Sequence, residues 1–437
     1  MKKEFKTDGI RGIAQEDFGP EMFFKIGNFI GQNSGFILVG KDTRETSNLY
    51  AQSVINGAIS SGCDVFDVGE CTTPALACLT KHYGANYGVM ITASHNPYIY
   101  NGIKIFNKIG EKINEVLQSK ISEVINIEPF VPSYSLSLGK IYDKSSYLID
   151  IYLKEIFEEF DLSSLKEENF LIDASNGGGY LLLPALFHGY GIDNFYTIGN
   201  KPNGKNINDN VGSLHFANKI NLLNKYKCKF GFALDGDGDR LIGLSSSGVL
   251  DGDILSYLII KYNLKKYSAG AVVTPITNRK IISLLTDLGL KIYQSSVGDQ
   301  NVYNEMLLRG CKIGFEKSGH ILFFNHPCDG IYSICQFLTT YIKNKEEITK
   351  ELQNPLINPS TMINLKIKNE DECLKKINSE EFQNKTKKLL GNNSYIYIRK
   401  SGTENLLRIY LEGESETKIK HSKAFILEEV KAYLCAE

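Results

Sequence analysis

The stretch Tyr87-Gly88-Val89-Met90-Ile91-Thr92-Ala93-Ser94-His95-Asn96-Pro97 joins an apolar, β-prone run to small and polar residues that stop at a proline. This pattern predicts a strand that ends in a tight loop. The loop carries a hydroxyl at Ser94 and an imidazole at His95. A serine in this position could be a nucleophile or a phosphoryl carrier, or it could be a turn residue that satisfies local backbone groups.

The segments on both sides of this stretch alternate between strand and helix patterns, which is typical of βαβ units with a largely parallel sheet. We expect strands at 36–40, 63–69, 87–91, 170–173, 231–234, 271–273 and 311–313, and helices at 47–61 and 74–83. After about residue 358 the pattern changes to a small α+β unit, with a strand at 361–367, a helix at 370–390, a strand pair around 401–402 and a helix at 418–434.

Polar stretches at 132–146 and 251–253 are predicted seams between units. With a length of 437 residues, too long for one ordinary core, these seams predict an α/β protein of four domains. The predicted ranges are 1–145, 146–250, 251–357 and 358–437.

Composition excludes several classes of function. The formal net charge is -1, which favours neither a nucleic-acid partner nor a membrane surface. No apolar run approaches about 18 residues, so we expect neither a signal peptide nor a membrane span. The nine cysteines are scattered and form no C-x-x-C pair, which indicates reduced thiols and a cytoplasmic protein.

A second strand pattern, at 231–234, leads into Asp235-Gly236-Asp237-Gly238-Asp239-Arg240. Three carboxylates at alternate positions repel one another unless a cation lies among them. Oxygen ligands suit Mg²⁺ or Ca²⁺, and the spacing excludes an EF-hand because position six is Arg240 rather than glycine. The loop therefore predicts a Mg²⁺ site that handles phosphate, against the alternative of a solvated acidic turn.

Two further loops combine chemically useful side chains. Residues 314–320 combine Glu316, Ser318 and His320 with glycines at 314 and 319, a set that could grip sugar hydroxyls or form a polar turn. Residues 399–405 place hydroxyls and backbone N–H groups beside a glycine, and two arginines are close in sequence. This combination favours an anion-binding loop that holds a phosphate. The phosphate-binding candidates are Arg399, Ser401, Gly402, Thr403 and Arg408.

Taken together, the strings TASHNP (92–97), DGDGDR (235–240), GFEKSGH (314–320) and RKSGTEN (399–405) resemble the four signatures of the α-D-phosphohexomutases. The resemblance covers essentially the whole chain. It implies three mixed α/β domains and a C-terminal TATA-binding-protein-like α+β domain around a central cleft. Lys317 departs from the family pattern, which commonly has glutamine there, and Lys400 and Asn405 stand where the family has prolines.

Within the family, TDGIRG (7–12) and ASHNPYIYNGIKIF (93–106) are most similar to the bacterial phosphoglucosamine mutases. This similarity implies interconversion of glucosamine 6-phosphate and glucosamine 1-phosphate, an amino-sugar step toward cell-wall precursors. It also implies a small-molecule sugar phosphate as partner and glucosamine (or glucose) 1,6-bisphosphate as intermediate or activator. We expect a monomer or a homodimer.

The resemblance also assigns roles to residues of this chain. Ser94 would be the phosphoserine, and its phosphate oxygen would bind Mg²⁺ together with Asp235, Asp237 and Asp239. Arg240 and Lys104 would offset charge on the transferring group. The general base remains open among Lys104, His95, Arg11 and His320.

Three other functions remain possible at this point. The first is a phosphoglucomutase or phosphomannomutase of the same family. The second is a Mg²⁺-dependent sugar phosphatase that hydrolyses its phosphoenzyme. The third is an inactive phosphate-sensing relative, which the intact Ser94 and aspartate triplet disfavour.

Overall fold

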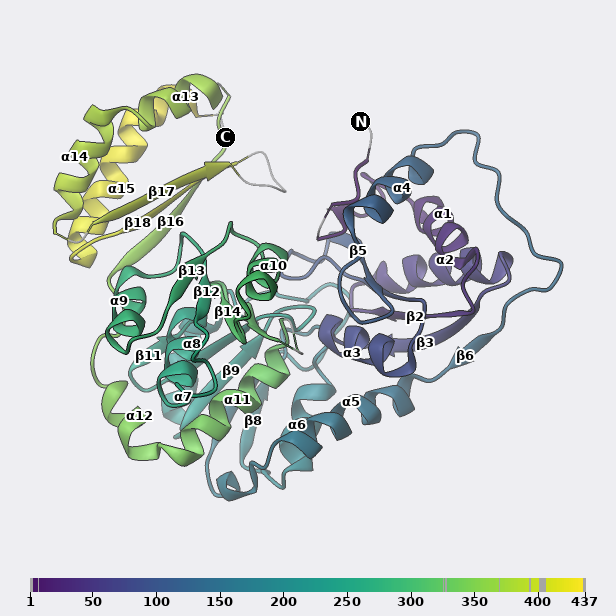
Figure 1. The fold of residues 1–437 in the computed structure, drawn as a ribbon, viewed down its shortest axis with the longest axis horizontal. Helices are drawn as coiled ribbons and strands as arrows, with labels where there is room; N and C mark the ends of the chain where they lie inside the picture. The colour runs from purple at the N-terminus through teal and green to yellow at the C-terminus, as the bar shows by residue number, and fades with distance from the viewer. Residues whose placement is uncertain are drawn as a thin grey trace.

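The computed structural model describes residues 3–6, 8–324, 326, 328–368, 370–392, 394–400 and 406–434. The strands in these residues form four sheets, of six, five, four and three strands. We call the parts of the chain around these sheets the first, second, third and fourth units (Figure 1). Among the described residues, no helix has both the length and the apolar character needed to cross a membrane.

The first unit contains β1 (Ile10–Ile13), α1 (Pro20–Gly31), β2 (Phe36–Lys41), α2 (Ser47–Ser60), β3 (Asp64–Glu70), α3 (Thr73–Tyr83), β4 (Tyr87–Ile91), β5 (Tyr100–Asn107), α4 (Glu115–Ile125) and β6 (Ile141–Asp143). Its sheet has the order β1-β5-β4-β2-β3-β6, with β4, β2, β3 and β6 parallel and β5 antiparallel to both neighbours. The predicted strands and helices of this region are confirmed to within one residue at each end.

Successive side chains of a strand point to opposite faces of a sheet, and in the first sheet both faces are buried. Ile37 and Val39 pack with α1, α2 and α4, whereas Leu38 packs with α3 on the other face. The predicted seam at 132–146 includes the short edge strand β6. The strand before Ser94 therefore lies near the middle of a sheet covered by helices on both sides.

The second unit contains β7 (Phe170–Asp173), α6 (Leu182–Gly189), β8 (Phe195–Ile198), α7 (Ile220–Lys225), β9 (Phe230–Leu234), β10 (Leu241–Ser245) and β11 (Gly248–Leu250), and α5 (Ser145–Glu159) leads into it. The third contains α8 (Gly252–Lys261), β12 (Ala271–Val273), α9 (Arg279–Asp287), β13 (Ile292–Gln294), α10 (Asp299–Arg309), β14 (Ile313–Phe315), β15 (Ile321–Phe323), α11 (Gly330–Lys343) and α12 (Lys345–Glu351). One continuous apolar core joins the first three units.

Two predictions in the third unit need correction. The stretch 251–253 is not a linker, because Asp251 caps the N-terminus of α8 by accepting a hydrogen bond from the Ile254 N–H at 3.0 Å. The strand predicted at 311–313 runs instead from Ile313 to Phe315. The GFEKSGH stretch consequently begins inside a strand, and Glu316 is the first residue beyond it.

The fourth unit contains β16 (Ser360–Leu365), α13 (Glu370–Ile377), α14 (Glu380–Leu390), β17 (Tyr395–Lys400), β18 (Leu407–Glu412) and α15 (Glu416–Val430). It has its own apolar core. The predicted strand pair around 401–402 is confirmed, whereas the single helix predicted at 370–390 is wrong. Ser379 starts a new helix there by capping α14 through its hydroxyl.

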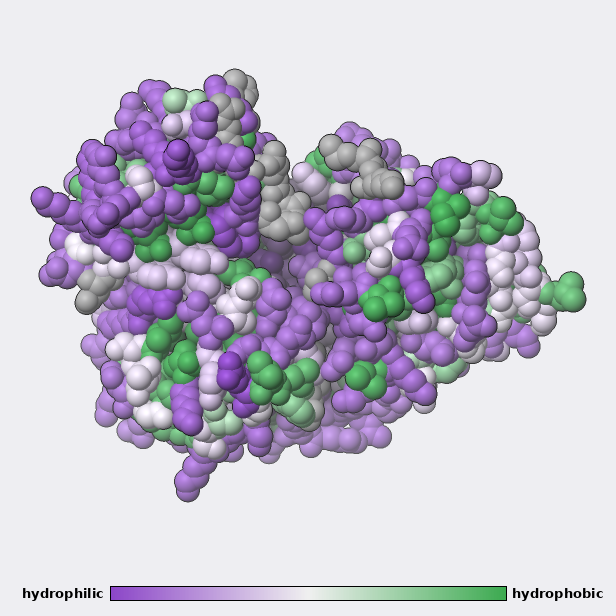
Figure 2. Space-filling view, turned by 45° about the horizontal axis from the view of Figure 1, so that its top comes forward, coloured by the Kyte–Doolittle hydropathy of each residue, from purple (hydrophilic) through white to green (hydrophobic). Residues whose placement is uncertain are grey.

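The fourth unit stands beside α9 and is separate from the first unit (Figure 1). Glu412 connects it to the third unit, because both oxygens of the Glu412 carboxylate accept a hydrogen bond from the Arg279 N–H at 3.0 Å. The space-filling view shows the surface hollowed between the fourth and first units (Figure 2). The domain boundaries themselves remain predictions.

Candidate active site

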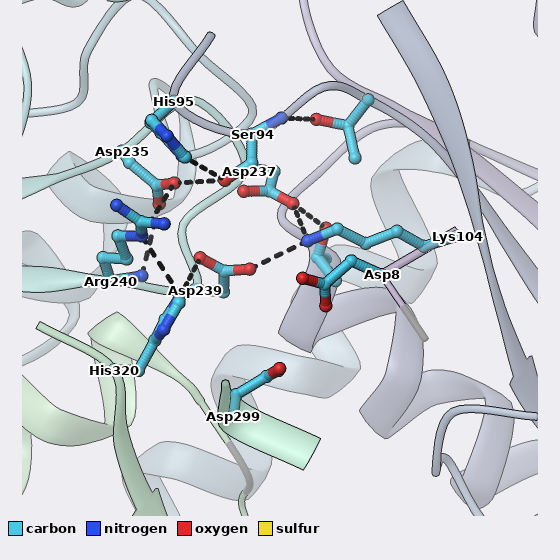
Figure 3. A network of polar contacts seen from close by, with 12 residues as sticks. Asp8, Ser94, His95, Lys104, Asp235, Asp237, Asp239, Arg240, Asp299 and His320 are labelled. Atoms are coloured by element: carbon cyan, nitrogen blue, oxygen red, sulfur yellow. Dashed lines mark hydrogen bonds and ion pairs between the residues drawn. The ribbon is translucent and has the colours of Figure 1, made fainter. Parts of the chain in front are cut away.

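Ser94 lies in the loop that follows β4 and is almost completely buried. Its backbone has φ 53°, a left-handed conformation that is uncommon for a serine. The Ser94 hydroxyl donates to Asp235 Oδ2 at 2.7 Å, and His95 Nδ1 lies 3.5 Å from Ser94 Oγ (Figure 3). The backbone strain aims this hydroxyl at the acidic loop of the second unit.

The acidic loop connects β9 to β10 and presents Asp235, Asp237 and Asp239 toward Ser94 (Figure 3). One carboxylate oxygen from each residue lies within 4.8 Å of the other two, and all three residues are buried. Gly236 lets the acidic loop approach the Ser94 backbone closely, because a Cβ at this position would lie 2.5 Å from the Ser94 carbonyl oxygen.

This cluster fits a hard divalent cation. Asp237 Oδ1 is buried and has no hydrogen-bond partner among the described residues. Burial, together with the charges of Asp239 and Asp237, raises the pKa of Asp235 to about 7. A cation among these oxygens would offset that repulsion, and an all-oxygen donor set is the one that Mg²⁺ prefers.

Lys104 reaches the cluster from β5 of the first unit. Its ammonium donates to Asp237 Oδ2 at 2.6 Å and to Asp239 Oδ2 at 2.8 Å. Against the effect of burial, these carboxylates raise the pKa of Lys104 above its usual value. Asp237 also accepts a hydrogen bond from Thr73 at 2.6 Å, so two elements of the first unit hold this carboxylate.

His320 and Arg240 lie on the opposite side of the cluster from Lys104 (Figure 3). His320 contacts Glu316 Oε2 through Nδ1 at 2.9 Å and Asp239 Oδ1 through Nε2 at 3.2 Å. Although burial and Arg240 act against it, the Asp239 and Glu316 carboxylates raise the pKa of His320 to about 10. Arg240 Nε also donates to His320 Nε2 at 3.1 Å, so the imidazole links Arg240 to the Glu316 and Asp239 carboxylates.

The four candidate bases occupy different environments. Lys104 and His320 are ion-paired as described above. His95 lies beside the Ser94 hydroxyl, and the nearby Arg240 charge, burial and the Arg11 charge lower the pKa of His95 to about 2. Arg11 lies on β1, opposite Gly102 of β5. Their catalytic roles remain predictions.

The sugar-loop candidates are held by the turn between β14 and β15. Glu316 is buried, and its Oε1 accepts the Gly298 N–H at 2.9 Å. Ser318 is half-buried. Lys317 is bound within the third unit, because its ammonium donates to Asp251 Oδ2 at 2.8 Å. The atypical lysine is therefore neutralised by the carboxylate that caps α8.

The phosphate-loop candidates are described only in part. Ser401, Gly402 and Thr403 lie outside the described residues. Arg399 and Arg408 lie directly opposite each other on β17 and β18. Like charges opposed in this way destabilise a sheet, and burial and Arg408 lower the pKa of Arg399. This pair of guanidinium groups would be stabilised by an anion such as phosphate.

One group that positions Ser94 was not among the sequence candidates. Arg44 follows β2 and is fully buried as a side chain. Its guanidinium donates to the Ser94 and Asn96 carbonyl oxygens, each at 2.8 Å, and pairs with Asp42 at 2.9 Å. Asp42 in turn accepts from the Thr92 hydroxyl. The GKDTR string at 40–44 was a signal for this network, although it gave no indication of what Arg44 contacts.

We expect Arg44→Met to lower the free energy of unfolding by about 3–5 kcal/mol, because it leaves the buried Asp42 carboxylate without its cation. We expect Arg44→Lys to fold but to lower kcat about 100-fold, since lysine cannot bind several carbonyl oxygens in one plane. Urea unfolding and steady-state kinetics measure both effects, with the exposed Arg309→Lys as control. Unchanged kcat in Arg44→Lys would contradict this role.

A cavity of about 520 Å³ lies behind the site, between the first and third units. Lys104 and Asp239 line it, whereas Ser94 and Arg240 do not. Its other walls include Phe106, Leu322 and residues of α3 and α10. The seam between the first and third units is therefore partly hollow.

Comparison with known proteins identifies the family. Three family models of phosphoglucomutase/phosphomannomutase match the chain. The model of α/β/α domain I matches residues 2–131, that of α/β/α domain III matches 251–356, and that of the C-terminal domain matches 362–429. The chain is 35% identical over 441 residues to a phosphoglucosamine mutase of Clostridioides difficile, covering 96% of this chain and 97% of that one. It is 33% identical over 434 residues to one of Nautilia profundicola, with 96% of both chains covered.

Solved structures show the same fold. A phosphoglucomutase/phosphomannomutase family protein of Burkholderia thailandensis matches 99% of this chain and 98% of that one, with a TM-score of 0.78 at 20% identity. An Aspergillus fumigatus N-acetylphosphoglucosamine mutase, solved with GlcNAc-6P and magnesium, matches 98% and 95% with a TM-score of 0.68 at 16% identity. The predicted phosphohexomutase architecture is confirmed, and the chain belongs to the phosphoglucomutase/phosphomannomutase family, the α-D-phosphohexomutases.

Proposed function

We propose that this protein is a phosphoglucosamine mutase, an isomerase that interconverts glucosamine 6-phosphate and glucosamine 1-phosphate. The near full-length similarity to curated phosphoglucosamine mutases supports the substrate class. The observation that carries the chemistry is the buried Ser94 hydroxyl, 2.7 Å from one of three clustered carboxylates. The enzyme acts in the cytoplasm on a small-molecule sugar phosphate, as a monomer or a homodimer.

The aspartate triplet and Ser94 would hold Mg²⁺. The unpartnered Asp237 oxygen and the mutual repulsion of the three carboxylates support this assignment. When bound, the ion supplies a Lewis acid that neutralises phosphoryl charge. Lys104 and Arg240 stand on either side of the cluster and add positive charge to the same region.

Ser94 carries the phosphoryl group between substrate positions. The bond from phosphorus to Ser94 Oγ breaks while a bond forms to the free hydroxyl oxygen of the sugar monophosphate, whose proton passes to a base. The product of this step is the 1,6-bisphosphate. After the bisphosphate reorients, Ser94 Oγ bonds to the other phosphorus while the bond from that phosphorus to the sugar oxygen breaks. The base returns its proton to this sugar oxygen, which releases the product monophosphate and regenerates the phosphoenzyme. Arg44 keeps the Ser94 loop in place through both transfers, since phosphoryl transfer depends mainly on positioning and charge.

Two loops hold the parts of the substrate that do not react. Glu316 and Ser318 bind the sugar, with His320 fixing the Glu316 carboxylate. A buried carboxylate suits the ammonium group of glucosamine, and Lys317 does not oppose it because Asp251 already binds the Lys317 ammonium. Arg399 and Arg408 anchor the second phosphate, together with the predicted Ser401, Gly402 and Thr403.

A coupled assay with Mg²⁺ and catalytic bisphosphate tests this function by comparing glucosamine 6-phosphate, glucose 1-phosphate and mannose 1-phosphate. We expect the highest kcat/KM with glucosamine 6-phosphate. A higher kcat/KM with glucose 1-phosphate or mannose 1-phosphate would reassign the substrate within the family. Release of inorganic phosphate without isomerisation would instead indicate a phosphatase.

A further inference from the structure

Lys112 bridges the first and third units close to the site without belonging to it. It follows β5, and its ammonium donates to Asp8 Oδ1 at 2.6 Å and to the two oxygens of Asp299 at 2.8 and 2.7 Å. The side chains of Lys112 and Asp299 are 13% and 14% exposed, so this ion pair is largely shielded from solvent. Against burial, the two carboxylates raise the pKa of Lys112 above its usual value.

Part of the seam that Lys112 crosses is hollow, although the apolar core continues between the units elsewhere. The 520 Å³ cavity lies there, and Lys112 and Asp299 form part of its wall. Another hydrogen bond between described residues spans the seam, from the Tyr303 hydroxyl to Glu111 Oε1 at 3.0 Å. Close-packed side chains normally fix the alignment of two units, so at a hollow seam that task falls to polar contacts.

The Asp299 end of the bridge leads to the sugar loop. Asp299 is the first residue of α10 and follows Gly298, whose φ of 122° is a conformation that favours glycine. The Gly298 N–H donates to Glu316 Oε1 at 2.9 Å. Because Asp299 and Gly298 are adjacent, the Lys112 ammonium holds the donor that orients Glu316.

The Asp8 end leads to β1, the strand that carries Arg11. Asp8 precedes β1, and the next residue, Gly9, packs closely on β5, since a Cβ there would lie 1.8 Å from the Ile103 carbonyl oxygen. The Lys112 and Arg11 charges lower the pKa of Asp8, so this carboxylate stays ionised and available to the bridge. Figure 3 shows Asp8 beside Lys104, on the side of the aspartate cluster away from His95.

We propose that Lys112 is a positioning residue of the mutase reaction. It touches none of the reacting atoms, but it holds β1, which carries Arg11, and the Glu316 loop at a set separation on the two sides of the proposed substrate site. This inference rests on the proposed function, because a bisphosphate that reorients needs both elements in place for each of the two transfers. Without the bridge, the sugar loop can shift relative to Ser94, and a shift of about 1 Å lowers the rate about 100-fold.

The variant Lys112→Met tests the bridge, since it keeps the apolar stem and removes the ammonium. Lys108→Met is a matched control, because Lys108 is an exposed lysine in the same turn. We expect Lys112→Met to lower kcat/KM for glucosamine 6-phosphate about 100-fold, with a raised KM and a raised requirement for added bisphosphate. Lys112→Arg should recover most of the loss, and Lys108→Met should match the unsubstituted protein.

A double-mutant cycle separates this role from general loss of stability. If the ion pair carries the effect, Lys112→Met combined with Asp299→Asn should be little worse than either single variant. Fully additive losses, or unchanged kcat/KM in folded Lys112→Met, would overturn the proposal. If Lys112→Met does not fold, the comparison of Lys112→Arg with Asp299→Asn decides: a loss in Asp299→Asn alone supports the bridge, and no loss in either overturns it.

Hydrogen exchange gives a readout that does not depend on activity. In Lys112→Met we expect faster exchange of the Gly298 amide and of the β1 amides than in the control, without substrate present. Unchanged exchange at both places would overturn the bridge even if the enzyme is confirmed as a mutase. Lack of turnover by the unsubstituted protein on all three sugar phosphates would instead refute the proposed function.

Discussion

Ser94→Ala is expected to abolish mutase turnover, with a fall in kcat of at least about 10³-fold, because the group that carries the phosphoryl is removed. The fold should remain intact. The contacts that hold this loop do not use the Ser94 side chain, so the variant keeps them. The Ser94 backbone N–H donates to the Thr92 hydroxyl at 2.9 Å, and Arg44 and Asn208 donate to the Ser94 carbonyl oxygen. Steady-state kinetics and circular dichroism measure the two parts of this result.

The control for this variant is Ser246→Ala, which changes an exposed serine in the turn between β10 and β11. It should retain full activity. Ser94→Ala should also lose exchange of phosphoryl between enzyme and bisphosphate, whichever sugar is used. A well-folded Ser94→Ala protein with near-normal mutase activity would contradict the role of Ser94 as carrier.

Removal of the metal site is expected to have the second largest effect. Chelation with EDTA should inactivate the enzyme, and Mg²⁺ should restore activity and raise the melting temperature, because an ion that binds only the folded state stabilises it. Asp237→Asn removes one of the three charges that attract the ion. We expect this variant to lose at least about 100-fold in kcat/KM at a fixed Mg²⁺ concentration.

For the metal-free protein, we expect the same substitution to do no harm to the fold. Burial and Asp239 raise the pKa of Asp235 most, and Asp237 adds to this effect, so loss of the Asp237 charge relieves part of the repulsion in the cluster. Metal-free Asp237→Asn should therefore keep its fold, while its melting temperature hardly responds to Mg²⁺. Asp287→Asn, an exposed change at the end of α9, is the control. An unaltered Mg²⁺ response in Asp237→Asn would show that the triplet is not the metal site.

Much of the fold could be predicted because the local patterns are strong. Strands such as 170–173 and 271–273 were predicted with their observed bounds, since short apolar runs bounded by polar residues leave little choice. Two of the errors fell at helix starts, and a third displaced the strand predicted at 311–313 by two residues. Asp251 and Ser379 both act as N-caps, and such residues are as typical of loops as of helix starts. The stretch 251–253 was therefore predicted as a seam, and a helix break near 379 was missed.

The candidate site could be predicted within each loop but not between loops. Asp235, Asp237 and Asp239 are close in sequence, and their convergence follows from the glycines between them. The contact of Thr73 with Asp237 spans 164 residues, and that of Lys112 with Asp299 spans 187. Such contacts depend on how whole units pack, which no local pattern encodes, so the contacts of Arg44, Lys112 and Asp299 emerged only from the structure.

The most direct test of the central claim is mass spectrometry of the protein after incubation with glucose 1,6-bisphosphate and Mg²⁺. The account predicts that one phosphoryl group is added and that peptide mapping locates it on Ser94. A chase with glucosamine 6-phosphate should remove the group and yield glucosamine 1,6-bisphosphate. Turnover of glucosamine 6-phosphate with no phosphoryl group ever found on Ser94 would contradict the account.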